Sequence, residues 1–282
     1  MCRMKKTKKI DIHCHTTNRK IEHTVESRAT LNRILEKMQE HNIEKTVVLA
    51  SYFPHRSSGI SNFRLLNWIQ ENGNKNKFYF FGSLDFEHYF YQGFNELNEL
   101  AEKNKLDGIK VYTGYQKVDL DSHKFRRLLF LAKDNEIPMM FHTGYSFMAR
   151  RRYNKPSIEK MVKASDLEFV AKEGVSVMAS HLGKPFFDDT TNIASRNNNF
   201  YSDVSGLVNS RYDKREKEQC VDGIRRFLEK AGPDKLLFGT DFPVQTHEDS
   251  IYFVEQAMKG FNVNDKKKVY YDNARRLLEN GK

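Results

Sequence analysis

Two histidines separated by a single residue stand near the start of the chain, in residues 10–15 (IDIHCH). Alternate side chains of a strand lie on one face, so an extended segment here would place His13 and His15 together and Cys14 on the opposite face. Two neutral imidazoles on one face can bind one divalent ion, and imidazole nitrogen suits zinc and its first-row neighbours. Because such a pair also arises by chance, further ligands are needed to define a metal site.

Three further residues that could bind a metal or move a proton follow short apolar runs. They are His142, His181 and Asp241, and each histidine is followed two residues later by glycine. A carboxylate that leaves an apolar strand is costly to bury without a cation or a hydrogen-bond donor. Each residue alone could be structural, as a hydrogen-bonded histidine or an aspartate that caps a turn. Their common position at the ends of predicted strands is what indicates a shared site.

Short apolar runs alternate with longer amphipathic ones along the chain, a pattern typical of βα units and a parallel sheet. We predict strands at Lys9–His13, Lys45–Ala50, Phe78–Leu84, Gly108–Tyr112, Pro138–His142, Val175–Ser180, Phe200–Ser205 and Lys235–Gly239. We predict helices at Thr30–His41, Phe63–Glu71, Phe94–Asn104, His123–Asn135, Ser157–Lys172, Cys220–Ala231, Ser250–Met258, Asp265–Tyr270 and Asn273–Glu279.

Eight strands alternating with helices in 282 residues predict a single α/β domain, a (β/α)8 TIM barrel that spans residues 1–282. A doubly wound open sheet is the alternative, although no Gly-x-Gly-x-x-Gly follows the first strand. In a closed barrel the active site lies at the carboxyl ends of the strands. The two histidines of strand one, His142, His181 and Asp241 all fall there, at strands one, five, six and eight.

The order and spacing of these segments resemble the amidohydrolase superfamily, and within it the amidohydrolase-related branch. That branch includes aminocarboxymuconate semialdehyde decarboxylase and related aromatic-acid decarboxylases and hydrolases. The resemblance covers nearly the whole chain. It rests on residues 10–15 (IDIHCH), 108–110 (GIK), 138–144 (PMMFHTG), 180–183 (SHLG), 201–206 (YSDVSG), 238–243 (FGTDFP) and 273–278 (NARRLL).

The resemblance implies a role for each residue of the site. The metal ligands would be His13, His15, His142 and Asp241, with Asp241 also catalytic beside the bound water. His181 would be the general base or would orient the water. A divalent ion with an open position lowers the pKa of bound water towards about 7, which suits this arrangement. We expect one ion, with zinc as the first candidate and manganese as the second.

Lys110 leaves the number of metal ions open. In other branches of the superfamily a carboxylated lysine at the end of strand four bridges two metals. In the amidohydrolase-related branch the Gly-Ile-Lys segment often has no bridging role. We therefore favour one ion, with Lys110 in contact with substrate or water, over two ions bridged by a carboxylated Lys110.

Three more residues are predicted to bind substrate. Arg56 lies in the segment after strand two, and Arg150 lies among basic and tyrosine residues after strand five. Arginine at these positions could hold a carboxylate or phosphate, although a solvated basic loop is an alternative. Asp203 lies near the end of strand seven and could orient a ligand or contact substrate, or could make an ordinary hydrogen bond at a strand end.

Bulk properties limit the classes of partner. The net charge of +10 is scattered along the chain, so it favours a solvated surface over a nucleic-acid site. No stretch of the sequence has as many consecutive apolar residues as a membrane helix needs, about 20. The first ten residues are basic and are not followed by the apolar segment typical of a secretory signal. The three cysteines show no paired spacing. We expect a cytoplasmic protein with a small-molecule substrate and no nucleic-acid or membrane partner, and by resemblance a homodimer.

Several functions remain open at this point. The first is hydrolysis of a C–O or C–N bond in a small anionic substrate by a metal-activated water. The second is non-oxidative decarboxylation of an unsaturated or aromatic acid at the same site. A TatD-like phosphoesterase or deoxyribonuclease is a third, although those enzymes usually carry a glutamate near the position of Gly108–Lys110. A barrel that binds a ligand without turnover is the non-enzymatic alternative.

Overall fold

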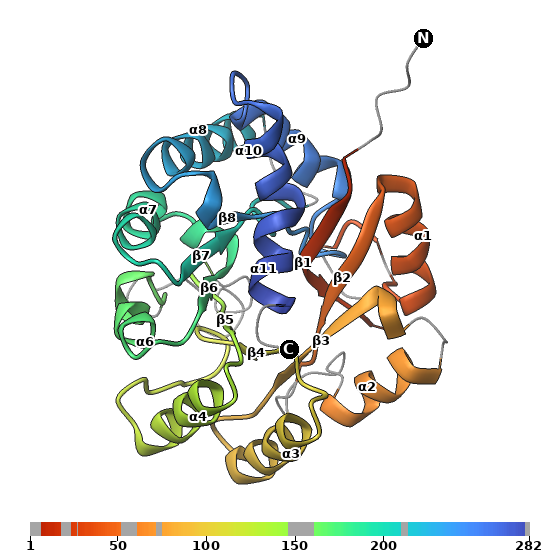
Figure 1. The fold of residues 1–282 in the computed structure, drawn as a ribbon, viewed down its shortest axis with the longest axis vertical. Helices are drawn as coiled ribbons and strands as arrows, with labels where there is room; N and C mark the ends of the chain where they lie inside the picture. The colour runs from red at the N-terminus through yellow and green to blue at the C-terminus, as the bar shows by residue number, and fades with distance from the viewer. Residues whose placement is uncertain are drawn as a thin grey trace.

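A computed structural model describes residues 7–17, 24–26, 28–51, 61–71, 75–145, 161–209 and 214–279. Within them, eight strands form one parallel sheet whose order in space follows the order in the chain (Figure 1). The strands are β1 (Lys9–His15), β2 (Ile43–Leu49), β3 (Phe78–Ser83), β4 (Gly108–Val111), β5 (Met139–Phe141), β6 (Val177–Ala179), β7 (Phe200–Asp203) and β8 (Leu236–Leu237). All eight predicted strands are confirmed, with small shifts of their ends.

The segment that follows β8 closes the sheet against β1. The N–H of Ile12 donates to the carbonyl of Phe238 at 3.0 Å, and the N–H of His15 donates to the carbonyl of Phe242 at 2.8 Å. Cys14 and Phe242 form a parallel bridge between these hydrogen bonds. The sequential strand order and this closure confirm the (β/α)8 barrel and rule out the open doubly wound sheet.

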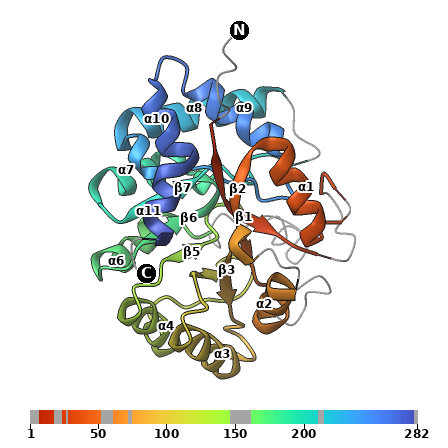
Figure 2. The same ribbon diagram turned by 45° about the vertical axis from the view of Figure 1, so that its right-hand side comes forward.

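Helices surround the strands on the outside of the barrel, and the last one, α11, lies over one end of it (Figures 1 and 2). They are α1 (Leu31–His41), α2 (Asn62–Glu71), α3 (Phe90–Glu102), α4 (His123–Asp134), α6 (Glu168–Lys172), α7 (Phe187–Arg196), α8 (Lys214–Ala231), α9 (His247–Ala257), α10 (Val263–Lys267) and α11 (Asn273–Glu279). None of the helices in the described part of the chain is long and apolar enough to cross a membrane.

Helix α7 was not predicted from the sequence. Its residues 187–196 (FDDTTNIASR) include Asp, Thr, Asn and Ser, which compete for backbone hydrogen bonds and lower helix propensity. The helix forms because its inner face is buried: Ile193 and Ala194 pack in the core, and Thr190 and Thr191 are almost fully covered. Tertiary packing therefore overrides local propensity at this helix.

The barrel has two apolar layers. Large side chains of the strands, among them Phe81, Met140 and Met178, fill its interior, and a second cluster lies between strands and helices. Helix α11 lies over the centre of the ring of strands (Figure 1), and its Leu278 joins the inner cluster. At the same end, Glu279 accepts hydrogen bonds from Lys45 and Tyr79. Because α11 covers the amino ends of the strands, the carboxyl ends are the end left for a site.

Candidate metal centre

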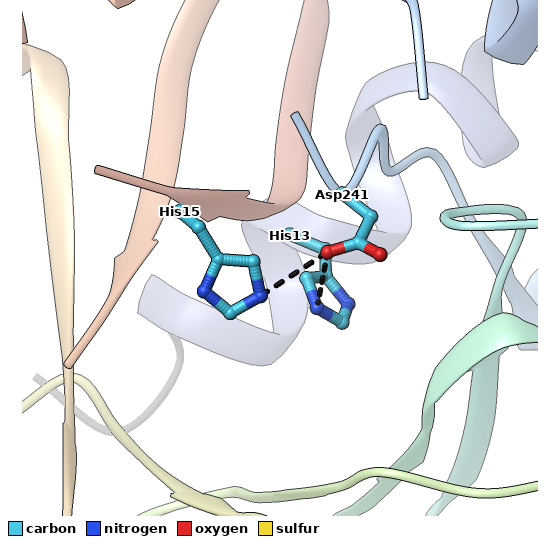
Figure 3. Close-up of side chains that lie close together, drawn as sticks. All are labelled: His13, His15 and Asp241. Atoms are coloured by element: carbon cyan, nitrogen blue, oxygen red, sulfur yellow. Dashed lines mark ion pairs between the residues drawn. The ribbon is translucent and has the colours of Figure 1, made fainter. Parts of the chain in front are cut away.

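Three side chains from the two ends of the chain meet at the carboxyl ends of the strands (Figure 3). Nε2 of His15 lies 3.1 Å from Oδ1 of Asp241, and Nε2 of His13 lies 3.5 Å from the same oxygen. The three ligand atoms all lie within 4.8 Å of one another. Two imidazoles and one carboxylate are a donor set that suits zinc, and they leave room for further ligands.

An irregularity in β1 positions the two histidines. Ile10 and Ile12 face the barrel interior, whereas Cys14 packs in the outer layer against the helices. The pairing register with β2 shifts between Asp11 and Cys14, so the regular alternation of faces changes there. As a result His13, directly after the inward Ile12, also reaches the site. The predicted shared side of His13 and His15, with Cys14 opposite, is confirmed.

Asp241 is held by strained backbone at the point where the barrel closes. Its φ of 56° lies in the left-handed region, which is uncommon for residues other than glycine. The backbone N–H of Asp241 donates to the carbonyl of His13 at 2.7 Å. This left-handed residue and its hydrogen bond bring the carboxylate next to strand one and its imidazoles.

Asp203 lies beneath the histidines and is fully buried. Its Oδ2 is 3.1 Å from Nδ1 of His13, and its Oδ1 accepts from the backbone N–H of His181 at 2.9 Å. The same Oδ1 accepts the N–H of Ser205 at 3.0 Å and its hydroxyl at 2.5 Å. Asp203, His13 and His181 form a second group that could hold a metal ion. The prediction that Asp203 contacts substrate gains no support from these contacts.

His142 and His181 face each other across the site. Nδ1 of His142 lies 3.1 Å from Nε2 of His181, and Nε2 of His142 lies 3.2 Å from the carbonyl of Tyr145. Tyr115 packs edge-on against the His142 ring, with ring centres 4.6 Å apart. Neither group of possible metal ligands includes His142. Its role as a metal ligand stays a prediction, and it requires one of its nitrogens to turn toward His13 and His15.

Lys110 is 1% exposed and projects from β4 toward the strand-six side of the site. Its Nζ donates to the hydroxyl of Ser180 at 2.8 Å. Among the described residues, no carboxylate forms an ion pair with Lys110 within 4.0 Å. Burial lowers the pKa of Lys110 to about 8, although Asp203 and Asp241 oppose this shift. Nζ also lies 5.5 Å from the centre of the Tyr112 ring. A buried ammonium without a carboxylate partner among the described residues is suited to receive an anion.

The electrostatics of the site favour metal binding. Burial lowers the pKa of His13 to about 3, and it also lowers the pKa values of His142 and His181. These imidazoles are therefore neutral near pH 7, the form in which they bind metals. Burial raises the pKa of Asp241, but the neighbouring histidines lower this pKa by a larger amount. The pKa of Asp241 therefore lies below its usual range, and the carboxylate is ionised.

The absence of a side chain at Gly206 keeps the site open. A Cβ there would lie 2.6 Å from Oδ2 of Asp241 and 2.7 Å from Nδ1 of His181. The residue also has φ of 57°, a conformation that glycine adopts readily. A larger residue would displace the carboxylate or the imidazole, so this position has to be glycine for the site to keep its shape.

Comparison with known proteins identifies the family. A family model described as amidohydrolase matches residues 10–279. The chain belongs to the amidohydrolase family. It matches no curated protein.

Solved structures share the fold of this amidohydrolase. A probable 2-pyrone-4,6-dicarboxylic acid hydrolase from Acinetobacter baumannii, with citric acid bound, is 17% identical with a TM-score of 0.68, over 96% of this chain and 98% of that one. The 2,6-dihydroxybenzoate decarboxylase from Rhizobium is 15% identical with a TM-score of 0.68, over 98% and 100%. An amidohydrolase from Burkholderia multivorans with bound zinc is 13% identical with a TM-score of 0.66, over 96% and 99%. At these identities the likeness shows the fold alone.

Sequence reasoning missed several residues that support the site of this amidohydrolase. Asp11, Ser205 and Thr240 each bond to a histidine or lie beside a predicted ligand. Their positions next to His13, Asp203 and Asp241 were the available signal, because small polar residues beside ligands often orient them. Two predicted substrate residues, Arg56 and Arg150, lie outside the described residues.

Proposed function

We propose that this protein is a metal-dependent hydrolase that attacks a C–O or C–N bond of a small anionic substrate with activated water. The observation that carries the proposal is the convergence of His13, His15 and Asp241 at the carboxyl end of the barrel. Membership of the amidohydrolase family supports it. A carboxylate and two imidazoles in this position are the parts that such chemistry needs.

His13, His15 and Asp241 would hold one divalent ion, with His142 as a further ligand. Zinc is our first candidate and manganese the second, and a solved amidohydrolase of the same fold contains zinc. A divalent ion bound there supplies a Lewis acid and lowers the pKa of water at the site towards about 7. A second ion at a carboxylated Lys110 is the less favoured arrangement.

His181 is suited to move the proton. Its Nδ1 lies 2.8 Å from the carbonyl of Ser205, which can only accept, so Nδ1 carries the hydrogen. Nε2 of His181 is then left with a lone pair, which faces Nδ1 of His142 at 3.1 Å and can accept a proton from water once His142 turns toward the metal. Burial lowers the pKa of His181, and this keeps Nε2 unprotonated near pH 7. His181 therefore acts as a general base, and the carboxylate of Asp241 orients the attacking water.

Lys110 would bind a negatively charged group of the substrate. Its buried ammonium has no carboxylate partner within ion-pair distance among the described residues. The structures of similar fold include a protein named as a dicarboxylic acid hydrolase that holds citric acid. That name and ligand support a substrate with at least one carboxylate, which could pair with Lys110. We further propose a small-molecule substrate, and a cytoplasmic homodimer.

Non-oxidative decarboxylation of an aromatic or unsaturated acid is the second candidate. It would use the same residues, and one structure of the same fold is a 2,6-dihydroxybenzoate decarboxylase. The buried Lys110 suits a substrate carboxylate in this reaction as well. The two reactions differ in the bond that breaks, so products and not site geometry distinguish them.

A substrate panel combined with metal analysis tests the proposal. The panel measures acid release from carboxylated lactones, esters and amides, and carbon dioxide release from carboxylated aromatic acids. We expect hydrolysis, with bound metal lost in His15→Ala and Asp241→Asn and retained in His123→Gln, a matched control at an exposed position of α4. Carbon dioxide release alone would favour the decarboxylase. Protein that binds no divalent metal would contradict both functions.

A further inference from the structure

One carboxylate touches both the candidate metal ligand on β1 and the candidate base after β6. Asp203 is fully buried, and each of its oxygens has a defined set of partners. Oδ2 lies 3.1 Å from Nδ1 of His13, while Oδ1 accepts three hydrogen bonds from His181 and Ser205. Among the described residues, this carboxylate is covered completely and its hydrogen bonds go to His13, His181 and Ser205. Its contacts suggest that it controls the two imidazoles.

The hydroxyl of Ser205 decides which atoms carry hydrogen. It has one hydrogen, and it donates this hydrogen to Oδ1 of Asp203 at 2.5 Å. Its oxygen therefore accepts from Nδ1 of His13, 3.0 Å away, and from Nδ1 of His181, 3.1 Å away. Both imidazoles are thereby assigned the tautomer with hydrogen on Nδ1. The backbone carbonyl of Ser205 independently requires the same tautomer of His181.

We propose that Asp203, acting with Ser205, is a positioning residue that fixes the Nδ1–H tautomer of His13 and His181. Nε2 of His13 is then available to a metal ion, and Nε2 of His181 carries a lone pair that faces Nδ1 of His142 at 3.1 Å. This inference rests on the proposed function for its consequence, but the tautomers themselves do not depend on it. A carboxylate behind a ligating histidine is a common means of orienting the ring and raising its basicity.

Asp203 also supports the backbone that presents the base. His181 has φ of 63° and Leu182 has φ of 50°, two consecutive residues in the left-handed region. The N–H of His181 donates to Oδ1 of Asp203, so the carboxylate holds this turn. The side chain of Asp203 thus holds the backbone of His181, the candidate base, and the ring of His13, the candidate metal ligand.

The substitution Asp203→Asn makes a specific prediction. Three donors point at the position of Oδ1, so the amide oxygen of asparagine is expected to take that place. The amide NH₂ then faces Nδ1 of His13 and favours the tautomer that accepts there and carries hydrogen on Nε2, in competition with the Ser205 oxygen that accepts from Nδ1. A histidine with hydrogen on Nε2 cannot offer that atom to a metal. An asparagine at the orienting carboxylate of a serine protease triad causes the same kind of error.

Two measurements test the inference. Carbon-13 and nitrogen-15 shifts of labelled histidine in metal-free wild-type protein report each tautomer, with His13→Asn and His181→Asn used only to assign signals. We expect Nδ1–H at both residues. Competition with a colorimetric chelator measures affinity for Zn²⁺, and we expect Asp203→Asn to bind about 10- to 100-fold more weakly. Ser205→Ala removes the oxygen that accepts from both Nδ1 atoms but keeps the carboxylate, so its affinity for Zn²⁺ should also fall, by less than that of Asp203→Asn.

Matched controls separate this role from loss of folding. Ser202→Ala removes a different buried hydroxyl, in β7, which donates to the carbonyl of Ala179. Asp249→Asn removes a buried carboxylate of α9, which bonds Thr246 and Lys217. Both controls should keep wild-type affinity for Zn²⁺.

Two outcomes would overturn the inference. The first is a hydrogen on Nε2 of His13 or His181 in the wild type, which can be measured even if Asp203→Asn does not fold. Wild-type affinity in a folded Asp203→Asn would also overturn it, whereas a wild type that binds no metal would contradict only the proposed function.

Discussion

Thr240 donates two hydrogen bonds to the carboxylate of Asp11. Its backbone N–H lies 3.0 Å from Oδ1 and its hydroxyl lies 2.6 Å from Oδ2. Oδ1 of Asp11 also accepts the backbone N–H of His13 at 3.1 Å. The carboxylate of Asp11 thus joins β1 to the segment after β8. One candidate ligand lies close by on each side of this link, His13 in β1 and Asp241 in the segment after β8. Burial raises the pKa of Asp11 to about 7, and the hydrogen bonds from Thr240 oppose this shift.

Replacing Thr240 by valine should weaken both the fold and the metal site. The change removes the hydroxyl donor and leaves a buried carboxylate oxygen without it, which costs about 1–3 kcal/mol in the free energy of unfolding. Zn²⁺ affinity should fall as well, because His13 and Asp241 lose a common support. Thr191→Val is the control, since its buried hydroxyl donates to the carbonyl of Phe187 away from the site. Equal Zn²⁺ affinity in the two variants would refute the link to the metal site.

Replacing His181 by asparagine should abolish proton transfer without removing the metal. We expect kcat to fall by about 10²- to 10⁴-fold on the substrate identified by the panel, because a positioned base contributes about that much. The metal content, measured by elemental analysis, should stay at the wild-type value. A parallel loss of metal would instead make His181 a ligand, as its place beside His13 and Asp203 would allow.

Replacing Lys110 by methionine should raise KM for the anionic substrate and leave the metal in place. Loss of a charge-assisted hydrogen bond worth about 1.5–3 kcal/mol predicts a rise of about 10- to 100-fold. Lys9→Met is the control, because Lys9 is also buried but bonds backbone carbonyls at the start of β1. Two ions per wild-type chain, reduced in Lys110→Met, would show instead that Lys110 bridges two metals.

Replacing His247 by phenylalanine should make stability less sensitive to acid. Burial lowers the pKa of His247 from 6.5 to about 3, with further lowering from His41, whose ring stacks on it at 5.2 Å. Its Nδ1 has no hydrogen-bond partner among the described residues, and its Nε2 lies 3.8 Å from Asp11. The neutral form is therefore the one that the fold accepts.

The sign of this effect follows from proton uptake. Below pH 6.5 the unfolded chain binds a proton at His247 that the folded chain does not, so the free energy of unfolding decreases as pH falls, down to about pH 3. The wild type should lose about 1.4 kcal/mol per pH unit more than His247→Phe over this range. Denaturant titrations at pH 7, 6 and 5 measure the difference, with His123→Gln as an exposed control. Parallel pH profiles of the wild type and His247→Phe would show that His247 is not the responsible group.

The sequence determined the strands and the order of the site residues. Alternating apolar runs are local features, so all eight strands and the shared face of His13 and His15 could be predicted. Helix α7 could not, because its polar residues favour other conformations and only packing of its inner face makes it helical. The closed barrel then explains why His15 and Asp241, at opposite ends of the chain, meet.

Only the tertiary structure decided what Asp203 and Asp11 do. Each was visible in the sequence as an acidic residue near a strand, but its partners come from other strands. Asp203 reaches His13 and His181, and Asp11 reaches Thr240, because barrel closure brings these strand ends within hydrogen-bond distance. The sequence therefore pointed to the metal ligands, whereas the residues that orient those ligands depend on distances that no local pattern contains.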